Sequence, residues 1–166
     1  MKRFQTRRRV AHSPEQMFAL VADIERYPEF LPLCEGLRVR ARKTRGDRPV
    51  LIADMTMGYK SIRETITSEV TLYPDEPKVT VSYLSGPFSR MENRWRFLPL
   101  ADGGCEIEFF IAYELRSTML GLLVSQVFDR AFRKFASAFE ARARTVYGAA
   151  GAAIGSGLPS GAPASA

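Results

Sequence analysis

Residues 105–147 decide the fold, and they read CEIEFFIAYELRSTMLGLLVSQVFDRAFRKFASAFEARARTVY. From Cys105 to Leu115 every second residue is apolar and glutamates lie between them, which predicts a strand with one buried face. From Ser117 to Tyr147 the apolar residues recur every three or four positions, as they do on one side of a helix. This apolar stripe consists of Val124, Val127, Phe128, Ala131, Phe132, Phe135, Ala138, Phe139 and Val146. Such a helix must bury its aromatic side chains against a sheet.

The residues before this stretch supply the rest of the sheet. Alternating apolar residues predict strands over residues 3–10, 37–41, 51–57, 62–72, 79–83 and 91–97. A helix start signal at Ser13-Pro14-Glu15-Gln16 and a short segment over residues 26–31 predict two short helices after the first strand. The sequence also predicts a tight turn or bulge at Gly58-Tyr59.

These elements predict an α+β fold of the helix-grip type. A curved antiparallel sheet of about seven strands wraps around the long C-terminal helix. The space between the sheet and the helix is a natural cavity.

The chain has 166 residues, which fits a single domain over residues 1–147. Residues 148–166 carry no charge and no periodicity, so we expect a disordered Gly/Ala/Ser/Pro tail. No apolar run reaches the roughly 18 residues that a membrane span needs, and the basic N-terminus lacks a secretory signal. With two widely separated cysteines, we expect reduced thiols and a cytoplasmic protein that can sit peripherally at the inner membrane.

The formal net charge is +6, and the basic residues gather in two clusters. The clusters are Lys2, Arg3, Arg7, Arg8 and Arg9, then Arg38, Arg40, Arg42, Lys43, Arg45 and Arg48. Together they favour attraction to a polyanion, either an anionic membrane surface or RNA, although any one arginine is more simply a solvated side chain. Charge alone does not choose between these two partners.

Catalytic signals are sparse. His12 is the one histidine and has no partners with which to bind a metal, and Cys34 has no histidine to activate it. We therefore expect no catalytic residue and no metal site. Glu64 stands out because it interrupts an apolar row. It either lies near a strand end or pairs with an arginine such as Arg94, or else it is a polar group inside the cavity.

Three apolar features exceed what one core requires. The segment Met119–Val124 is apolar on nearly all sides of its helix, and Gly86-Pro87-Phe88 places an aromatic at the tip of a loop. Met55 and Met57 offer adaptable side chains on an inward strand face. Each has an ordinary explanation in core packing, but jointly they predict a lined tunnel with an apolar gate.

Several segments together resemble the bacterial coenzyme Q-binding START-domain proteins, which are grouped with polyketide cyclases and lipid-transport proteins and include the ribosome-association toxin RatA. The segments are Val21-x-Asp23-x-Glu25-x-Tyr27-Pro28-x-Phe30-Leu31-Pro32-x-Cys34, Ala53-x-Met55-x-Met57-Gly58-Tyr59, Ser68-x-Val70, Gly86-Pro87-Phe88, Asn93-x-Trp95-x-Phe97, Phe109-x-Ile111-x-Tyr113-Glu114-Leu115 and Ala138-Phe139-Glu140-x-Arg142-Ala143. Leu33 stands where many relatives carry tryptophan. The resemblance covers residues 1–147 and implies a helix-grip fold that binds ubiquinone or a similar polyprenyl lipid.

Three functions remain open at this point. The first is a quinone chaperone or carrier that supports respiration or quinone biosynthesis. Its expected ligand-binding residues are Phe30, Met55, Met57, Phe88, Trp95, Phe109, Leu120, Val124, Phe128 and Phe132, with Glu64 as a polar cavity group. The second is a regulator that binds the large ribosomal subunit, as the RatA resemblance implies. The third is a cyclase-type enzyme acting through Glu64 or Tyr113. We expect no DNA partner.

Overall fold

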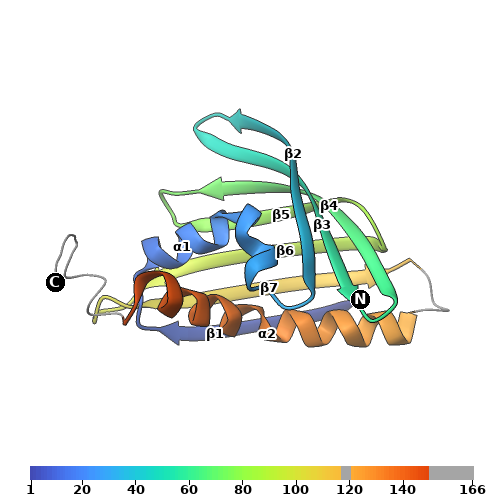
Figure 1. Cartoon of the computed structure of the whole chain (residues 1–166). Coiled ribbons are helices and arrows are strands. Elements are labelled where there is room, and N and C mark those ends of the chain that lie inside the picture. The colour runs from blue at the N-terminus through green and yellow to red at the C-terminus, as the bar shows by residue number, and fades with distance from the viewer. Residues whose placement is uncertain (117–120, 150–166) are drawn as a thin grey trace.

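The computed structural model describes residues 1–116 and 121–149 (Figure 1). Its elements follow the chain in the predicted order: strand, two short helices, six strands and one long helix. They are β1 (Lys2–Val10), α1 (Pro14–Ala22), η1 (Ile24–Glu29), β2 (Cys34–Arg45), β3 (Arg48–Tyr59), β4 (Ile62–Tyr73), β5 (Lys78–Ser85), β6 (Phe88–Pro99), β7 (Cys105–Leu115) and α2 (Gly121–Tyr147).

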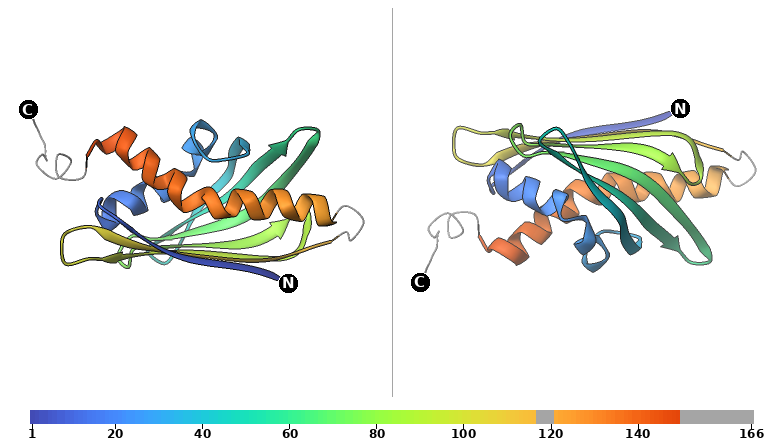
Figure 2. Two further views of the ribbon diagram at one scale, coloured as in Figure 1. Left: turned by 90° about the horizontal axis from the view of Figure 1, so that it is seen from below. Right: turned by 90° about the horizontal axis from the view of Figure 1, so that it is seen from above.

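The seven strands form one antiparallel sheet in the order β1-β7-β6-β5-β4-β3-β2. Hairpins join β2 through β7, while β1 crosses to pair with β7. Figure 2 shows α1, η1 and α2 on the same face of this sheet, and α2 runs diagonally along it. The helix-grip fold predicted from the sequence is therefore confirmed.

The short helices begin as the sequence predicts. The Ser13 hydroxyl accepts a hydrogen bond from the Gln16 amide at 3.1 Å, and the Gln16 side chain accepts one from the Ser13 amide at 3.0 Å. This reciprocal capping box fixes the start of α1. The second helix, η1, is a 3-10 helix that begins at Ile24, two residues before the predicted segment.

Aromatic side chains of α2 fill the centre of the molecule. The Trp95 ring of β6 lies 4.5 Å from Phe109 of β7 and 5.1 Å from Phe139 of α2, measured between ring centroids. All three residues are buried. Burial of these rings supplies most of the free energy that holds α2 against the sheet, because each removes a large apolar area from water.

The structure corrects three local predictions. Gly58 and Tyr59 belong to β3, and the turn follows them at Lys60, whose φ is 55°. Phe88 is not a loop-tip aromatic: it begins β6 and is fully buried against Tyr83, Tyr113 and Phe128. The Tyr83 hydroxyl also donates to its carbonyl and accepts from its amide. Ala41 is exposed, because the pairing register of β2 shifts between Val39 and Ala41.

Two further predictions fall partly outside the described residues. The predicted helix start at Ser117 lies in residues 117–120, and α2 is described from Gly121 onward. The predicted disordered tail also lies outside, apart from residues 148–149. Within the described part of the chain, no helix is long and apolar enough to cross a membrane.

Candidate functional site: two cavities beneath the C-terminal helix

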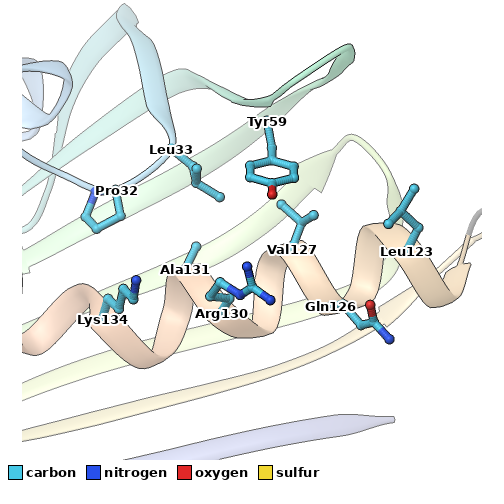
Figure 3. Close-up of a pocket in the computed structure, with 9 residues that line it drawn as sticks. All are labelled: Pro32, Leu33, Tyr59, Leu123, Gln126, Val127, Arg130, Ala131 and Lys134. Carbon is cyan, nitrogen blue, oxygen red and sulfur yellow. The ribbon is translucent and has the colours of Figure 1, made fainter.

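An outer cavity of about 140 Å³ opens between α2, the loop after η1 and the end of β3 (Figure 3). Pro32 and Leu33 come from the loop, and Tyr59 comes from β3. The residues that α2 contributes are Leu123, Gln126, Val127, Arg130, Ala131 and Lys134. The floor of this cavity is therefore apolar, and its rim carries polar and basic groups.

An inner cavity of about 70 Å³ lies deeper between the sheet and the helices. Its lining is apolar except for Ser68, Asn93 and the Tyr27 hydroxyl. The apolar lining residues are Ile24, Leu31, Leu37, Ala53, Met55, Ile66, Val70, Val79, Val81, Trp95, Phe135 and Phe139. Two of its three polar groups are already engaged: the Tyr27 hydroxyl donates to the Val21 carbonyl, and the Asn93 amide donates to the Phe110 carbonyl at 2.8 Å.

The two cavities are neighbours. Leu31 and Phe135 line the inner one, while Leu33 and Ala131 line the outer one. About one turn of α2 and a short piece of loop thus separate them.

The separating loop is held in an unusual conformation. Leu33 has a φ of 64°, in the left-handed region that costs a residue with a side chain roughly 1–2 kcal/mol. The Gly58 amide donates to the Leu33 carbonyl at 2.9 Å and holds this geometry. The Glu35 carboxylate lies over Gly58 and pairs with Arg63 at 2.8 Å, so a side chain at position 58 would require this flexible carboxylate to move.

The structure brings most of the predicted aromatic residues into one continuous cluster. Successive ring centroids along it lie 4.5–6.2 Å apart. In order, the rings are Phe30, Phe139, Trp95, Phe109, Phe135, Phe132, Phe128 and Phe88. Of the predicted members, only Trp95 lines the inner cavity, and the others pack against neighbouring aromatic rings. Their contact with a ligand stays a prediction.

The two methionines occupy different places. Met55 lines the inner cavity, whereas Met57 is buried in β3 opposite Cys34 on one side and Glu64 on the other. Glu64 is half-buried, two residues after the start of β4. Arg94 does not reach it, because that arginine pairs with Glu92 at 2.9 Å and lies over the Phe110 ring.

The remaining predicted residues are on α2. Val124 is buried in the core, and Leu120 lies outside the described residues. Leu122 and Leu123, from the segment with excess apolar residues, are 81% and 54% exposed. The apolar stripe by which α2 packs on the sheet therefore does not include these two leucines.

The reactive groups of the described chain are poorly placed for catalysis. Burial raises the pKa of the Cys34 thiol to about 11 and that of Cys105 to about 12, so both are protonated at neutral pH. The Tyr113 hydroxyl donates to the Ser125 carbonyl at 3.4 Å, and burial raises the pKa of Tyr113.

The two candidate acid–base residues are far apart in the sheet. Tyr113 of β7 and Glu64 of β4 are three strands apart, roughly 14 Å across the sheet. Over residues 1–116 and 121–149, no cluster of three potential metal ligands occurs.

Sequence reasoning missed the polar rim of the outer cavity. It singled out none of Gln126, Arg130 and Lys134, which are exposed side chains at the edge of the cavity. A usable signal was present, because three of the segments that carry the family resemblance contain Pro32, Tyr59 and Trp95 and converge on the two cavities. Their convergence depends on strand pairing, which periodicity does not report.

Comparison with known proteins agrees with this architecture. Residues 10–140 match the family model described as polyketide cyclase / dehydrase and lipid transport. The chain is 33% identical over 148 residues to the ribosome association toxin RatA of Vibrio cholerae, covering 89% of this chain and 99% of the relative. It is 30% identical to the mitochondrial coenzyme Q-binding protein COQ10 homolog B of Xenopus laevis, covering 82% of this chain and 55% of that protein.

A solved START superfamily protein from Mycobacterium smegmatis superposes with a TM-score of 0.73. The match covers 87% of this chain and 98% of that one at 22% identity, so it bears on the fold alone. The sequence match over most of the chain and the helix-grip fold together show that this protein belongs to the polyketide cyclase/dehydrase and lipid-transport family.

Proposed function

We propose that the protein binds ubiquinone or a similar polyprenyl lipid beneath α2 and acts as a quinone chaperone or carrier that supports respiration or quinone biosynthesis. The observation that carries the proposal is the pair of adjacent apolar cavities, of about 140 and 70 Å³, under one helix. Burial of an isoprenoid chain there is favourable by about 25 cal/mol per Å² of apolar area. The similarity to the COQ10 homolog supports the choice of ligand class.

Binding of a ring-bearing lipid requires the inner cavity to expand. Its volume of about 70 Å³ is less than half that of an apolar cavity of roughly 150 Å³ that holds benzene. Met55 can supply part of this adjustment, because its unbranched side chain changes rotamer easily. The ligand therefore changes the surroundings of Trp95 when it enters.

Trp95 makes a direct test possible, since it is the one tryptophan of the sequence and lines the inner cavity. We expect decylubiquinone to quench its fluorescence saturably, and we expect mass spectrometry to find quinone in lipid extracted from the purified full chain. Val127→Phe, which fills the outer cavity, is expected to weaken binding on the order of tenfold.

The matched control is Leu122→Phe, on the same helix but 81% exposed, which should leave affinity unchanged. If Val127→Phe and the unaltered chain bind decylubiquinone equally well, the ligand does not occupy the outer cavity. If there is neither quenching nor extractable quinone, the protein does not bind quinone.

A second candidate function is binding to the large ribosomal subunit. Its support is the similarity to RatA over 99% of that protein's length, together with exposed basic residues on the edge strand β2. Arg38 and Lys43 of β2 form no ion pair among the described residues and are free to contact phosphates. Co-sedimentation with large subunits that weakens steeply with salt is the expected outcome, and Arg38→Gln with Lys43→Gln should reduce it.

Cyclase chemistry is the third candidate, and the family name supports it in general terms. The separation of Glu64 and Tyr113 in the sheet disfavours an acid–base pair. Turnover of a polyketide substrate that Glu64→Gln abolishes would revive it.

A further inference from the structure

The rim of the outer cavity carries two basic side chains side by side. Arg130 and Lys134 lie four residues apart on α2, so they project from the same side of the helix, and both line the cavity. Figure 3 shows the Arg130 side chain between Val127 and Ala131, and Lys134 beside Pro32. Both cations therefore lie at the exposed edge of the outer cavity.

These two cations differ from other basic residues of α2. Arg133 pairs with Asp129 at 3.0 Å, Arg142 with Glu29 at 2.6 Å and Arg144 with Glu140 at 3.7 Å. Arg130 and Lys134 have no carboxylate within 4.0 Å among the described residues. Like charges four residues apart destabilise a helix, and an anion bound between them would relieve the repulsion.

Neutral donors complete the rim. The Tyr59 hydroxyl points from β3 toward α2 near Val127, and Gln126 adds an amide. The planar guanidinium of Arg130 suits the oxygens of a phosphate or carboxylate, to which it can donate two parallel hydrogen bonds. The cavity is also lined by Leu33, Leu123 and Val127. Their aliphatic side chains carry no hydrogen-bond donor for an anion, but they can pack against an apolar chain.

We propose that the outer cavity binds the acidic headgroup, a phosphate or a carboxylate, of a single-chain amphiphile. The headgroup lies between Arg130 and Lys134, and the chain runs over Leu33 and Val127 toward the inner cavity. The two cavities, of about 140 and 70 Å³, are too small for a lipid with two chains, and a single chain that reaches the inner cavity requires the same expansion as a quinone ring. A quinone headgroup can accept hydrogen bonds from Arg130 and Lys134, but it is neutral and cannot compensate their charge as a phosphate or carboxylate can. The inference thus goes beyond the proposed function and shares with it only the path of the chain.

The test compares probes that share one C15 isoprenoid chain and differ in the charge and chemistry of the headgroup. Binding of farnesol, farnesoic acid and farnesyl phosphate to the full chain is measured by Trp95 fluorescence and by calorimetry, with inorganic phosphate as the headgroup alone. At low ionic strength we expect the two acidic probes to bind on the order of tenfold tighter than farnesol. Added salt should remove much of this preference, because the rim is open to solvent.

Two double variants locate the effect. Arg130→Gln with Lys134→Gln should abolish the preference for the acidic probes and leave farnesol binding unchanged. The control, Arg3→Gln with Lys43→Gln, lowers the net charge by the same amount at exposed strand positions away from the cavity and should keep the preference.

Several results would overturn the inference. Equal binding of farnesol and the acidic probes shows that the cations take no part, and equal losses in both double variants show a general effect of net charge. Inorganic phosphate that binds as tightly as farnesyl phosphate excludes an amphiphile. If farnesyl phosphate binds tightly and quinone does not bind at all, the headgroup inference stands and the proposed quinone-binding function fails. The failure of one proposal can therefore be told apart from the failure of the other.

Discussion

The two halves of α2 have the same apolar spacing but different surroundings. The C-terminal half, residues 135–147, packs Phe139 against Tyr27, Phe30 and Trp95, with ring centroids 5.0–5.4 Å apart. Ion pairs from Arg142 to Glu29 and from Arg8 to Glu140 tie it to η1 and β1. In the N-terminal half, residues 121–134, Leu122 and Leu123 are exposed and the outer cavity lies beside the helix.

The difference teaches that one helix serves two purposes. The C-terminal half is covered by α1, η1 and the centre of the sheet, and it anchors the fold. The N-terminal half has only the Pro32–Leu33 loop and the end of β3 opposite its cavity side, which leaves space for a ligand. Stability should therefore depend on the buried rings of both halves, most strongly at Phe139, and binding should depend on the cavity side of the N-terminal half.

The largest effect is expected from Phe139→Ala. Phe139 is fully buried among three aromatic rings, so its truncation should lower the free energy of unfolding by about 3–5 kcal/mol. Leu123→Ala, at a position 54% exposed in the other half, should cost less than about 1 kcal/mol. Urea unfolding of both variants provides the measurement, and equal losses would refute the division between the halves.

A smaller effect of opposite sign is expected from Ser125→Ala. The Ser125 hydroxyl is buried and finds no hydrogen-bond partner among the described residues, so its removal should raise the free energy of unfolding by up to about 1 kcal/mol. Ser137→Ala is the control, because that hydroxyl donates to the Lys134 carbonyl while the gain in helix propensity is the same. A larger gain at Ser137 would show that propensity alone acts.

Acid should weaken the attachment of the C-terminal half. Hydrogen bonds from Arg26 and Arg142 lower the pKa of the exposed Glu29 carboxyl, so its stabilising effect is complete above the ordinary carboxyl pKa and is lost as the pH falls through the lowered one. Glu29→Gln should therefore be less stable than the unaltered chain at about pH 7 and equally stable at about pH 2.

The urea midpoint at each pH measures this difference. Asp47→Asn, in the exposed turn between β2 and β3, serves as the control and should change the midpoint little at either pH. A gap for Glu29→Gln that persists in acid would contradict the role given to its ion pairs.

The smallest effect on stability is expected from Leu122→Ser. The side chain is 81% exposed, and the free energy of unfolding should change by no more than about 0.5 kcal/mol. If this end of α2 meets an anionic membrane surface, flotation with anionic vesicles should nevertheless decrease. Leu84→Ser, 52% exposed on β5, is the matched control and should float like the unaltered chain. Equal flotation of all three proteins would place any membrane contact elsewhere.

Much of the fold was predictable because it depends on local patterns. Alternation marked the seven strands, helical spacing marked α2, and the Ser13–Gln16 pair marked the start of α1. The errors fell where a distant contact overrides the local signal. Gly58 is typical of a turn, yet it lies within β3, where it pairs with Arg63 of β4 and its amide donates to the Leu33 carbonyl. Phe88 is typical of a loop tip, yet Tyr83 and Tyr113 enclose it.

The candidate site was less predictable than the fold. Met55 and Trp95 line the inner cavity, as an inward strand position favours, but Phe128 and Phe132 fill space against each other. Hydrophobic periodicity indicates that a residue points inward, and it does not indicate whether another side chain or an empty volume lies opposite. The prediction of ligand contacts from spacing alone therefore cannot distinguish a cavity wall from a packed core.

The sequence by itself determined the elements, the buried face of each one and the excess of apolar residues near the start of α2, because these follow from the repeat of each secondary structure. Only the tertiary structure decided that Arg130 and Lys134 meet Leu33 and Tyr59 around one opening. These residues are about 70 to 100 positions apart in the chain. Their approach results from strand pairing and helix packing, which satisfy the whole core at once and leave no signal at any single position.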